Sequence, residues 1–459
     1  MDKPGLSHRL FDSVAGRIGG GRAAGDRHAR EAIALCHSLL SERGEVSGAT
    51  LARDALATYQ QLDGDALAVF FDLLAAEFSP DPGTVGRAAD AYRENPSPAN
   101  LLRLQAIVES PRQELFRRLN LAPHATATLV ELRRRVLEGL RTHPQWAAIE
   151  ADLVHLLRSW FNRGFLELRR IDWSTAAIVL EKLIQYEAVH QIQGWHDLRR
   201  RLQADRRCYA FFHPALPDEP VIFIEVALTR GMSDKVQPLL DPDSAVFDAR
   251  RADSAIFYSI TNCQEGLRGV SFGNFLIKQV AEDLGREFPR LKTFATLSPI
   301  PGFRRWLQSE VDASREDEPA RDELKRLLAK IDIDGWHLER RTLSEVQLPL
   351  TRLCAHYLLH AKHSAEPLDA VARFHLGNGA RMERLNWLGD VSVTGMQRSA
   401  GLMVNYVYRL ADVERNHEEY AKEHKVVASA RLKSLAEDHL LAHVAPGGRS
   451  AARGAKIRE

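Results

Sequence analysis

One continuous segment, SAIFYSIT-NCQEGLRG-VSFGNFLIKQVAEDL over residues 254–284, constrains the fold more than any other part of the sequence. Residues 254–261 are mainly apolar, β-branched and aromatic, which predicts a strand. The apolar residues at the end of the segment recur at helical spacing, which predicts a helix. Gly266, Gly269 and Gly273 lie between these two elements or at the mouth of the helix. A strand that passes directly into a helix predicts a sheet covered by helices.

The glycine turn has two interpretations. Its spacing matches neither G-x-G-x-x-G nor G-x-x-x-x-G-K-[ST], so the two common phosphate loops are excluded. The unpaired N–H groups and the dipole at a helix start still favour anions, and glycines let a phosphate approach them. Arg268 can add a bidentate contact to a phosphate group. Alternatively, the glycines only form a turn and let the helix pack closely on the sheet.

Three further runs predict strands of the same sheet. They are CYAFFHP (208–214), VIFIEVALT (221–229) and LKTFATLSPI (291–300). The proline-rich PALPDEP after the first run fits a hairpin loop. Strands joined by hairpins and then a strand–helix–strand unit predict an α+β domain whose sheet has mixed pairing.

The remaining chain reads as mostly helical. Amphipathic helical patterns follow one another from about residue 26, with no alternating segment among them. We therefore expect an all-helical N-terminal domain at 1–170, with a structural or oligomerisation role. A mixed-sheet catalytic domain with extra C-terminal helices is expected at 171–445. The charged stretch 311–323 is predicted to be a solvated insertion, and the basic, glycine-rich tail at 446–459 is predicted to be disordered.

Composition excludes several classes of protein. The chain has 62 basic and 61 acidic residues, so its net charge of +1 gives no general attraction to nucleic acid or membranes. The sequence shows no apolar run near the roughly 20 residues that a membrane helix needs. The four cysteines form no C-x-x-C pair, which favours reduced thiols. The N-terminus has no apolar core typical of a secretory signal, so a cytoplasmic location is predicted.

Two polar segments are candidates for chemistry. TLSPIPGF places Ser298 at a strand end, just before a turn defined by Pro299 and Pro301. Strand ends next to a phosphate-binding turn are common positions for catalytic groups. The second segment, residues 372–408, is rich in Gly, Asn, His and Trp and contains His375. Taken alone, the serine reads as a turn cap and the histidine as a helix-surface residue.

Two other chemistries fit less well. His356, His360 and His363 have a spacing in which metal ligands can occur, but the glutamate of H-E-x-x-H is absent and no acidic third ligand is evident. We therefore predict no metal site. A nucleophilic serine would give thioester hydrolysis, but no G-x-S-x-G elbow surrounds Ser298.

Five blocks make the sequence resemble the malonyl-CoA decarboxylase family: FIEVALTRGM, FYSITNCQEGLRGVSFGNFLIK, TLSPIPGF, FHLGNGARMERLNW and SAGLMVNYVY. The similarity extends from roughly Trp173 to Arg409. It implies a helical N-terminal domain, a catalytic domain like the GNAT-type acetyltransferases, and a homo-oligomer, a tetramer in this family. The acetyltransferase signature Q/R-x-x-G-x-G/A is not met, which disfavours plain acetyl transfer.

The resemblance also implies roles for individual residues. Ser298 is the expected proton acceptor and His375 the expected proton donor, with Tyr408 as a further site residue and Ser259 as a serine that lines the site. The CoA pyrophosphate is expected on the strand-to-helix turn, in contact with Arg268, Gly269, Val270, Ser271, Phe272, Gly273 and Asn274. A glutamate occurs in the family where this chain has Ser271, so we assign Ser271 to binding and not to catalysis.

The predicted reaction is the decarboxylation of malonyl-CoA to acetyl-CoA and CO2. Loss of CO2 leaves an enolate that fixed hydrogen-bond donors stabilise. His375, with a pKa near its normal value, protonates C2, while Ser298 orients the malonyl carboxylate. The thioester is itself the electron sink, so no cofactor is expected. The alternatives are a GNAT-like acyltransferase and a scaffold that binds CoA thioesters without turnover.

Overall fold

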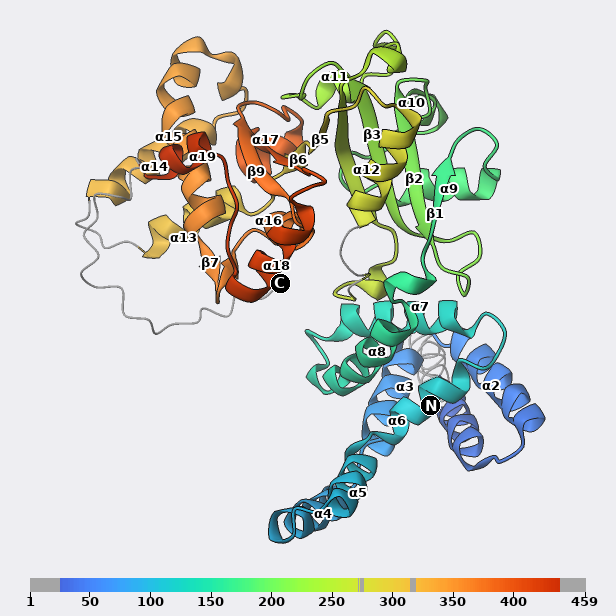
Figure 1. Cartoon of the computed structure of the whole chain (residues 1–459). Coiled ribbons are helices and arrows are strands. Elements are labelled where there is room, and N and C mark those ends of the chain that lie inside the picture. Colours follow the sequence, from blue (N-terminus) through green and yellow to red (C-terminus); the bar gives the residue numbers. More distant parts are fainter. Residues whose placement is uncertain (1–24, 271, 273–275, 314–318, 438–459) are drawn as a thin grey trace, which may run out of the picture. The chain divides into compact units, whose positions relative to one another are not determined.

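A computed structural model describes residues 25–270, 272, 276–313 and 319–437 of the chain (Figure 1). These residues form two compact units, which we describe separately. The helical unit comprises Met1–Glu167, Phe211–Val221 and Asn262–Gly273, and the sheet unit comprises Leu168–Ala210, Ile222–Thr261 and Asn274–Glu459, in each case within the described residues. The glycine turn therefore belongs to the helical unit.

The helical unit consists of short helices with well-defined starts. After a helix over residues 25–41 it contains α2 (Glu45–Gln60), α3 (Gly64–Glu77), α4 (Pro82–Glu94), α5 (Pro98–Val108), α6 (Pro111–Leu119), α7 (Ala125–Gly139) and α8 (Ala147–Trp160). Three consecutive helices begin with a proline that follows a capping side chain, namely Asp81, Ser97 or Ser110. Each cap accepts a hydrogen bond from a backbone N–H of the first turn, which explains these boundaries.

Gly266 is required for packing within the helical unit. It lies in the short 3-10 helix η4 (Glu265–Leu267), against α7. A Cβ atom at this position would lie 2.0 Å from the carbonyl oxygen of Val130. Arg133 from the same helix donates to the Gly266 carbonyl at 2.7 Å and also pairs with Glu150. For Gly266, the interpretation of the glycine as a packing residue is therefore sufficient.

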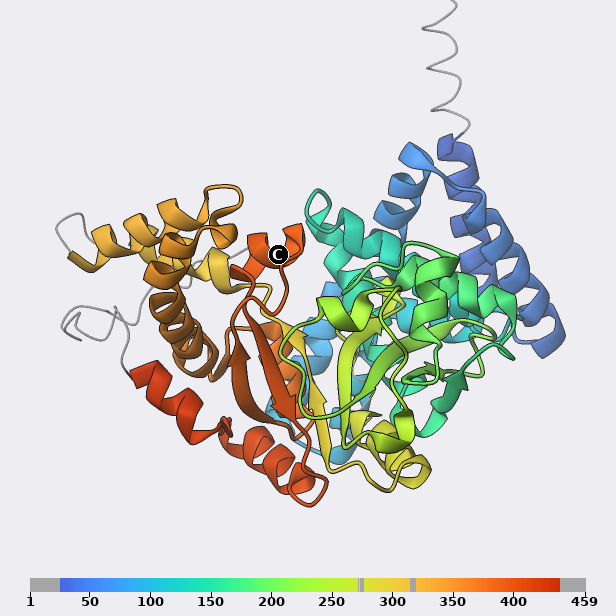
Figure 2. The same ribbon diagram turned by 90° about the horizontal axis from the view of Figure 1, so that it is seen from above.

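The sheet unit contains the mixed sheet expected from the sequence. Its strands are β1 (Glu167–Ile171), β2 (Arg206–Phe212), β3 (Pro220–Thr229), β4 (Ser254–Asn262), β5 (Thr293–Thr296), β6 (Ser298–Pro299), β9 (Arg381–Asn386) and β10 (Met403–Val407). They are arranged in the order β1-β2-β3-β4-β5-β10-β6, with β9 also paired to β10. Strands β4 and β5 are parallel, whereas β10 is antiparallel to β5, β6 and β9. Strands β9 and β10 lie side by side in Figure 2.

Helices connect these strands and extend the unit. The parallel pair β4–β5 is joined through α12 (Leu276–Glu287), as a parallel connection requires. The other helices are α9 (Ala177–Tyr186), α10 (Trp195–Arg201), α11 (Gln237–Leu240), α13 (Phe303–Ala313), α14 (Pro319–Ile331), α15 (Arg340–His360), α16 (Ala370–Gly377), α17 (Val393–Ser399), α18 (Val413–Glu423) and α19 (Ala430–Glu437). A small hairpin is formed by β7 (Lys362–His363) and β8 (Glu366–Pro367).

The α+β prediction, with a helical N-terminal region and a mixed sheet, is confirmed. The sequence did not predict two of the strands. The region after Leu348 is mostly helical as expected, but it also contributes β9 and β10, and β10 lies inside the sheet, between β9 and the continuous β5–β6 strand. Such short strands are hard to distinguish from helix by periodicity alone. In the charged stretch 311–323, Val311 at the end of α13 is buried, whereas the described acidic residues Asp312, Asp322 and Glu323 are exposed, in line with the expected solvation.

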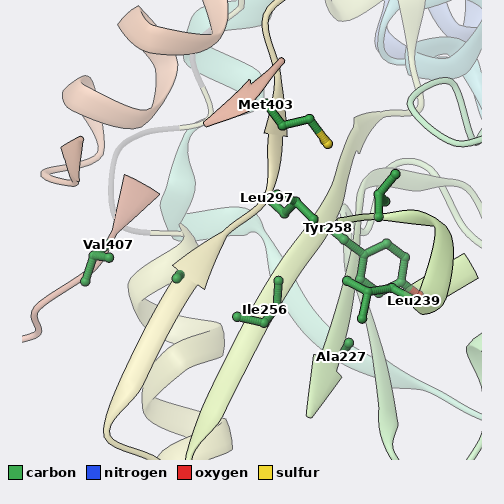
Figure 3. Packing of buried hydrophobic residues seen from close by; sticks show 9 residues of the cluster. Ala227, Leu239, Ile256, Tyr258, Leu297, Met403 and Val407 are labelled. Carbon is green, nitrogen blue, oxygen red and sulfur yellow. The ribbon is translucent and has the colours of Figure 1, made fainter. Parts of the chain in front are cut away.

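One face of the sheet carries an apolar core. Its members include Ala227 of β3, Ile256 and Tyr258 of β4, Leu297 and Met403 (Figure 3). Side chains alternate between the two faces of a strand. The residues next to these core positions along each strand, such as Ser259 beside Tyr258 and the two neighbours of Leu297, therefore face the opposite side of the sheet.

We expect Gly266→Ala to destabilise the protein. The added methyl group overlaps the Val130 carbonyl, so the turn or α7 must shift, at a cost of about 1–3 kcal/mol. Urea unfolding measures the change. Gly86→Ala in α4 is the matched control, because its Cβ would meet nothing within 4 Å and alanine stabilises an open helical position. Equal stabilities of the two variants would contradict this packing role.

Candidate active site

Ser298 lies just past the point where β5 separates from β4. The register between β4 and β5 runs as far as the pair Phe257–Thr296. On the other edge, β5 pairs with β10 at Ala295–Val407, and β6 continues this pairing in the same register, with Ser298 opposite Val404. Ser298 is only 5% exposed and Thr296 is fully buried. The end of β4, including Ser259, thus continues beyond its last paired residue on β5.

His375 joins the site from α16. The helix begins at the capping carboxylate of Asp369, which accepts a hydrogen bond from the backbone N–H of Ala372. His375 lies in its last turn and is 3% exposed, so its interpretation as a surface histidine is wrong. Its Nε2 lies 3.0 Å from Ser298 Oγ, and its Nδ1 lies 2.8 Å from the hydroxyl of Tyr408. Its ring also stacks on Tyr406, with 4.4 Å between centroids.

The structure therefore brings the three predicted catalytic residues together in one buried hydrogen-bonded chain. Tyr408 directly follows β10 and is 1% exposed. Nothing in the local sequence links Ser298, His375 and Tyr408, which come from a strand end, a helix and a strand end far apart in the chain. A hydroxyl, an imidazole and a phenol in line can pass or orient protons.

The protonation state of His375 differs from our expectation. Burial lowers the pKa of His375 to about 3, because the charged imidazolium loses its hydration. The expectation of a histidine with an ordinary pKa is therefore wrong for the free protein. At neutral pH the imidazole is neutral, with one nitrogen that donates and one that accepts. Burial likewise raises the pKa of the Tyr408 hydroxyl.

A network of polar side chains supports this site, and the sequence did not reveal it. The Asn405 amide donates to the carbonyl of Thr296 at 2.7 Å, and its oxygen accepts from Asn386 at 2.8 Å. Arg384 donates to both asparagine oxygens. Ser298 in turn donates to the Thr296 hydroxyl at 2.8 Å. Thr296 could have been found from the sequence, because it lies two residues before Ser298 and both side chains therefore lie on one face of a strand.

Ser259 belongs to a second buried cluster. Its hydroxyl contacts both oxygens of the Glu187 carboxylate, at 2.7 and 2.8 Å. Thr261 donates to the same carboxylate, and so do the backbone N–H groups of Val189 and His190. Glu187 was not predicted, and its cluster follows α9. Ser259 is thus held by a carboxylate and not by the chain that contains Ser298.

The predicted CoA-binding turn is described in part. Arg268 has a largely exposed side chain, 4.0 Å from Glu265, and both residues line a hollow of about 140 Å³ beside α7. Gly269 has a φ of +75° and nothing within 4 Å of a Cβ position, so glycine suits the turn conformation and leaves its surface open. Val270 and Phe272 are buried. Ser271, Gly273 and Asn274 lie outside the described residues.

The metal alternative gains no support. His356 and His360 have rings 5.2 Å apart, centroid to centroid. Among the residues that the structure describes, no group of three or more His, Cys, Asp or Glu side chains could hold a metal ion. A search of the same residues finds no helix that is long and apolar enough to span a membrane.

Comparisons with known proteins agree with this arrangement. The family models for the C-terminal and N-terminal domains of malonyl-CoA decarboxylase match residues 164–445 and 78–161. A mitochondrial malonyl-CoA decarboxylase from Anser anser anser is 36% identical over 407 residues, which are 81% of this chain and 80% of that protein. The rat counterpart is 37% identical over 347 residues, 70% of each chain.

Solved structures agree as well. The crystal structure of malonyl-CoA decarboxylase from Rhodopseudomonas palustris has a TM-score of 0.85 and 49% identity, covering 88% of this chain and 99% of that chain. The structure from Agrobacterium vitis has a TM-score of 0.82 and 47% identity, covering 89% and 100%. The chain therefore belongs to the malonyl-CoA decarboxylase family.

Proposed function

We propose that this protein decarboxylates malonyl-CoA to acetyl-CoA and CO2, with Ser298, His375 and Tyr408 as its catalytic residues. The observation that carries the assignment of residues is the buried chain Ser298–His375–Tyr408, with links of 3.0 and 2.8 Å. Membership of the family supports the reaction itself. The malonyl thioester supplies its own electron sink, so the side chains have to orient the carboxylate and supply one proton.

The first step breaks a carbon–carbon bond. The bond from C2 to the carboxylate carbon breaks, CO2 leaves, and the electron pair moves into the thioester as an enolate. Cleavage is fastest when this bond is aligned with the thioester π system, which requires a held carboxylate. We assign this role to the Ser298 hydroxyl, which in the substrate complex turns its hydrogen from Thr296 to the malonyl carboxylate while Oγ still accepts from His375 Nε2. Any donor aimed at the thioester oxygen adds stabilisation of the developing charge.

The second step forms a carbon–hydrogen bond. His375 is neutral, so the proton that it gives to C2 comes from an uncharged imidazole N–H on the Ser298 side. Tyr408 supplies its own proton to Nδ1, which avoids an imidazolate. After product release, Nε2 takes a proton from water and Nδ1 returns its proton to the tyrosine oxygen. One solvent proton is consumed for each CO2 released.

The CoA portion is assigned to the end of β4 and the turn that follows it. Beyond its last pair with β5 at Phe257, β4 carries backbone groups that can pair with the two amides of the pantetheine arm. Ser259 lies on this stretch. The open surface at Gly269 and the exposed guanidinium of Arg268 suit phosphates. The remaining contacts are assigned to Val270, Ser271, Phe272, Gly273 and Asn274.

Purified protein is expected to release CO2 and acetyl-CoA in equal amounts from malonyl-CoA, without added cofactor. His375→Gln and Ser298→Ala are each expected to lower kcat by about 10²–10⁴-fold, because each removes a group used in proton transfer or orientation. His213→Gln is the matched control: His213 is also buried and hydrogen-bonded, but it lies in the helical unit.

Other outcomes would identify the alternatives. A GNAT-like acyltransferase would release free CoA only when an amine acceptor is added. A scaffold would bind malonyl-CoA, measured by calorimetry, with no turnover. Full activity of His375→Gln would contradict the catalytic assignment even if wild-type protein is a decarboxylase.

Burial of neutral His375 also predicts an acid-sensitive stability. Its pKa in the folded protein is about 3, below the ordinary value of 6.5, so the unfolded chain binds the extra proton between these values. Stability from this site is present above pH 6.5 and is lost as the pH falls toward 3. Between pH 6.5 and 5 the wild type should lose about 2 kcal/mol more unfolding free energy than His375→Gln. Urea unfolding at both pH values measures this, and parallel losses would contradict it.

We also propose that the protein is a homo-oligomer, a tetramer by resemblance to its family, through its helical domain at 1–170. Helix α5 buries none of its residues and exposes Leu101, Leu102 and Val108. Leu102→Glu is expected to shift the protein to a smaller species in light scattering, whereas Gln105→Glu on the same helix should not. An unchanged mass for Leu102→Glu would exclude this surface.

Two further assignments complete the proposal. The catalytic domain is placed at 171–445, followed by a tail at 446–459 that lies outside the described residues. A cytoplasmic location is supported by the four cysteines, which are buried and form no disulfide within the described residues, as suits a reducing compartment. The curated relatives are named as mitochondrial proteins, so cell fractionation is the direct test.

A further inference from the structure

Thr296 is a buried residue in contact with the candidate active site, and the family resemblance assigned it no role. Its side chain is fully buried, and its hydroxyl lies 2.8 Å from Ser298 Oγ. It does not contact His375 in any hydrogen bond that the structure describes. Its hydroxyl is connected to the imidazole by hydrogen bonds through the serine between them.

The hydrogens along this chain can be assigned from the geometry. Ser298 has one hydroxyl hydrogen and donates it to the Thr296 oxygen. Ser298 Oγ must then accept in its other contact, at 3.0 Å, so the hydrogen in that contact belongs to His375 Nε2. A neutral imidazole carries one hydrogen, so Nδ1 is bare and accepts from the Tyr408 hydroxyl at 2.8 Å.

We propose that Thr296 is a positioning residue that fixes the tautomer of His375, by holding the Ser298 hydrogen away from Nε2. The imidazole therefore keeps its hydrogen on the nitrogen that faces the serine. This tautomer is the one that the proposed protonation of C2 needs, and this consequence for catalysis rests on the proposed function. The tautomer itself does not depend on that function, since it is a property of the free protein.

Hydrogen bonds from β10 hold Thr296 in place as the acceptor of the Ser298 hydrogen. The backbone N–H of Tyr406 donates to its hydroxyl oxygen at 3.2 Å, and the Asn405 amide donates to its carbonyl at 2.7 Å. Asn405 is fully buried and is itself fixed by Asn386. Tyr406 thus donates to one lone pair of the hydroxyl oxygen, and Ser298 donates to the other.

Removing the Thr296 hydroxyl should reverse the donor and acceptor roles in the hydrogen bonds that join Ser298, His375 and Tyr408. In Thr296→Val, a change of similar shape, the nearest acceptor left for the Ser298 hydrogen is His375 Nε2. The imidazole then carries its hydrogen on Nδ1 and donates it to the Tyr408 oxygen. Thr296→Ser keeps a hydroxyl group on Cβ, so the hydrogen bonds should keep the donor and acceptor roles of the wild type.

Nitrogen-15 NMR of histidine-labelled protein reports the tautomer directly, because protonated and bare ring nitrogens have well-separated shifts. The His375→Gln variant identifies the signals of this residue. We expect a protonated Nε2 in the wild type and in Thr296→Ser, and a protonated Nδ1 in Thr296→Val. A wild type with its hydrogen on Nδ1 would overturn the proposal whether or not any variant folds. An unchanged tautomer in Thr296→Val would overturn it too.

Kinetics with malonyl-CoA test the consequence for catalysis. In Thr296→Val, kcat should fall by at least about 10-fold, because the donor nitrogen no longer carries its hydrogen. KM should change little, since Thr296 is not assigned to substrate binding. Thr296→Ser should restore most of kcat. Thr126→Val, which removes a buried, hydrogen-bonded hydroxyl from the helical unit, is the matched control and should be unaffected.

The two readouts separate this inference from the proposed function. Suppose that the tautomer changes in Thr296→Val but the wild-type protein does not decarboxylate malonyl-CoA. That result would support the effect of Thr296 on the tautomer and would contradict the proposed function. An active wild type with kcat unchanged in Thr296→Val, despite a reversed tautomer, would show that the tautomer is not used. That result would overturn the positioning role.

Discussion

The burial of a single neutral imidazole is the constraint on which the site depends. Without water, His375 needs one acceptor and one donor, placed on opposite sides of its ring. Ser298 and Tyr408 meet these needs at 3.0 and 2.8 Å, and Tyr406 covers one face of the ring. Three separate parts of the sheet unit must therefore meet at one point. The low pKa of His375 follows from the same burial, and it makes this group a donor of a neutral N–H.

The pairing of β5 on both of its edges brings these parts together. Its pairing with β4 ends at Phe257–Thr296, whereas β5 and β6 both pair with β10 in one register, from Ala295–Val407 to Pro299–Met403. This continuous pairing holds Ser298 beside the strand that leads into Tyr408. Asn405 of β10 supports it, since it donates to the carbonyl of Thr296. The end of β4 continues past its last pair with β5, and this is where we propose the pantetheine arm.

The glycine turn shows how residues of one type can serve different purposes. Gly266 is required because Val130 leaves no room for a side chain. Gly269 has open space around it and a positive φ, so its conformation is the reason for glycine there. The sequence offered packing and phosphate binding as two interpretations of the whole turn, but the structure gives Gly266 and Gly269 different reasons for being glycine. Spacing could not separate the two, because a neighbour on α7 is distant in the sequence.

Local pattern and resemblance determined much of this protein. Strand and helix periodicity determined the α+β class, and the family blocks singled out Ser298, His375 and Tyr408, three side chains that the structure joins by hydrogen bonds. Tertiary structure alone decided that β10 lies inside the sheet, that His375 is neutral, and that Ser259 is bound to Glu187. The physical reason is that periodicity records which face of an element is apolar. Burial, the loss of hydration and hydrogen-bond partners depend on which elements meet, and residues far apart in the chain settle that together.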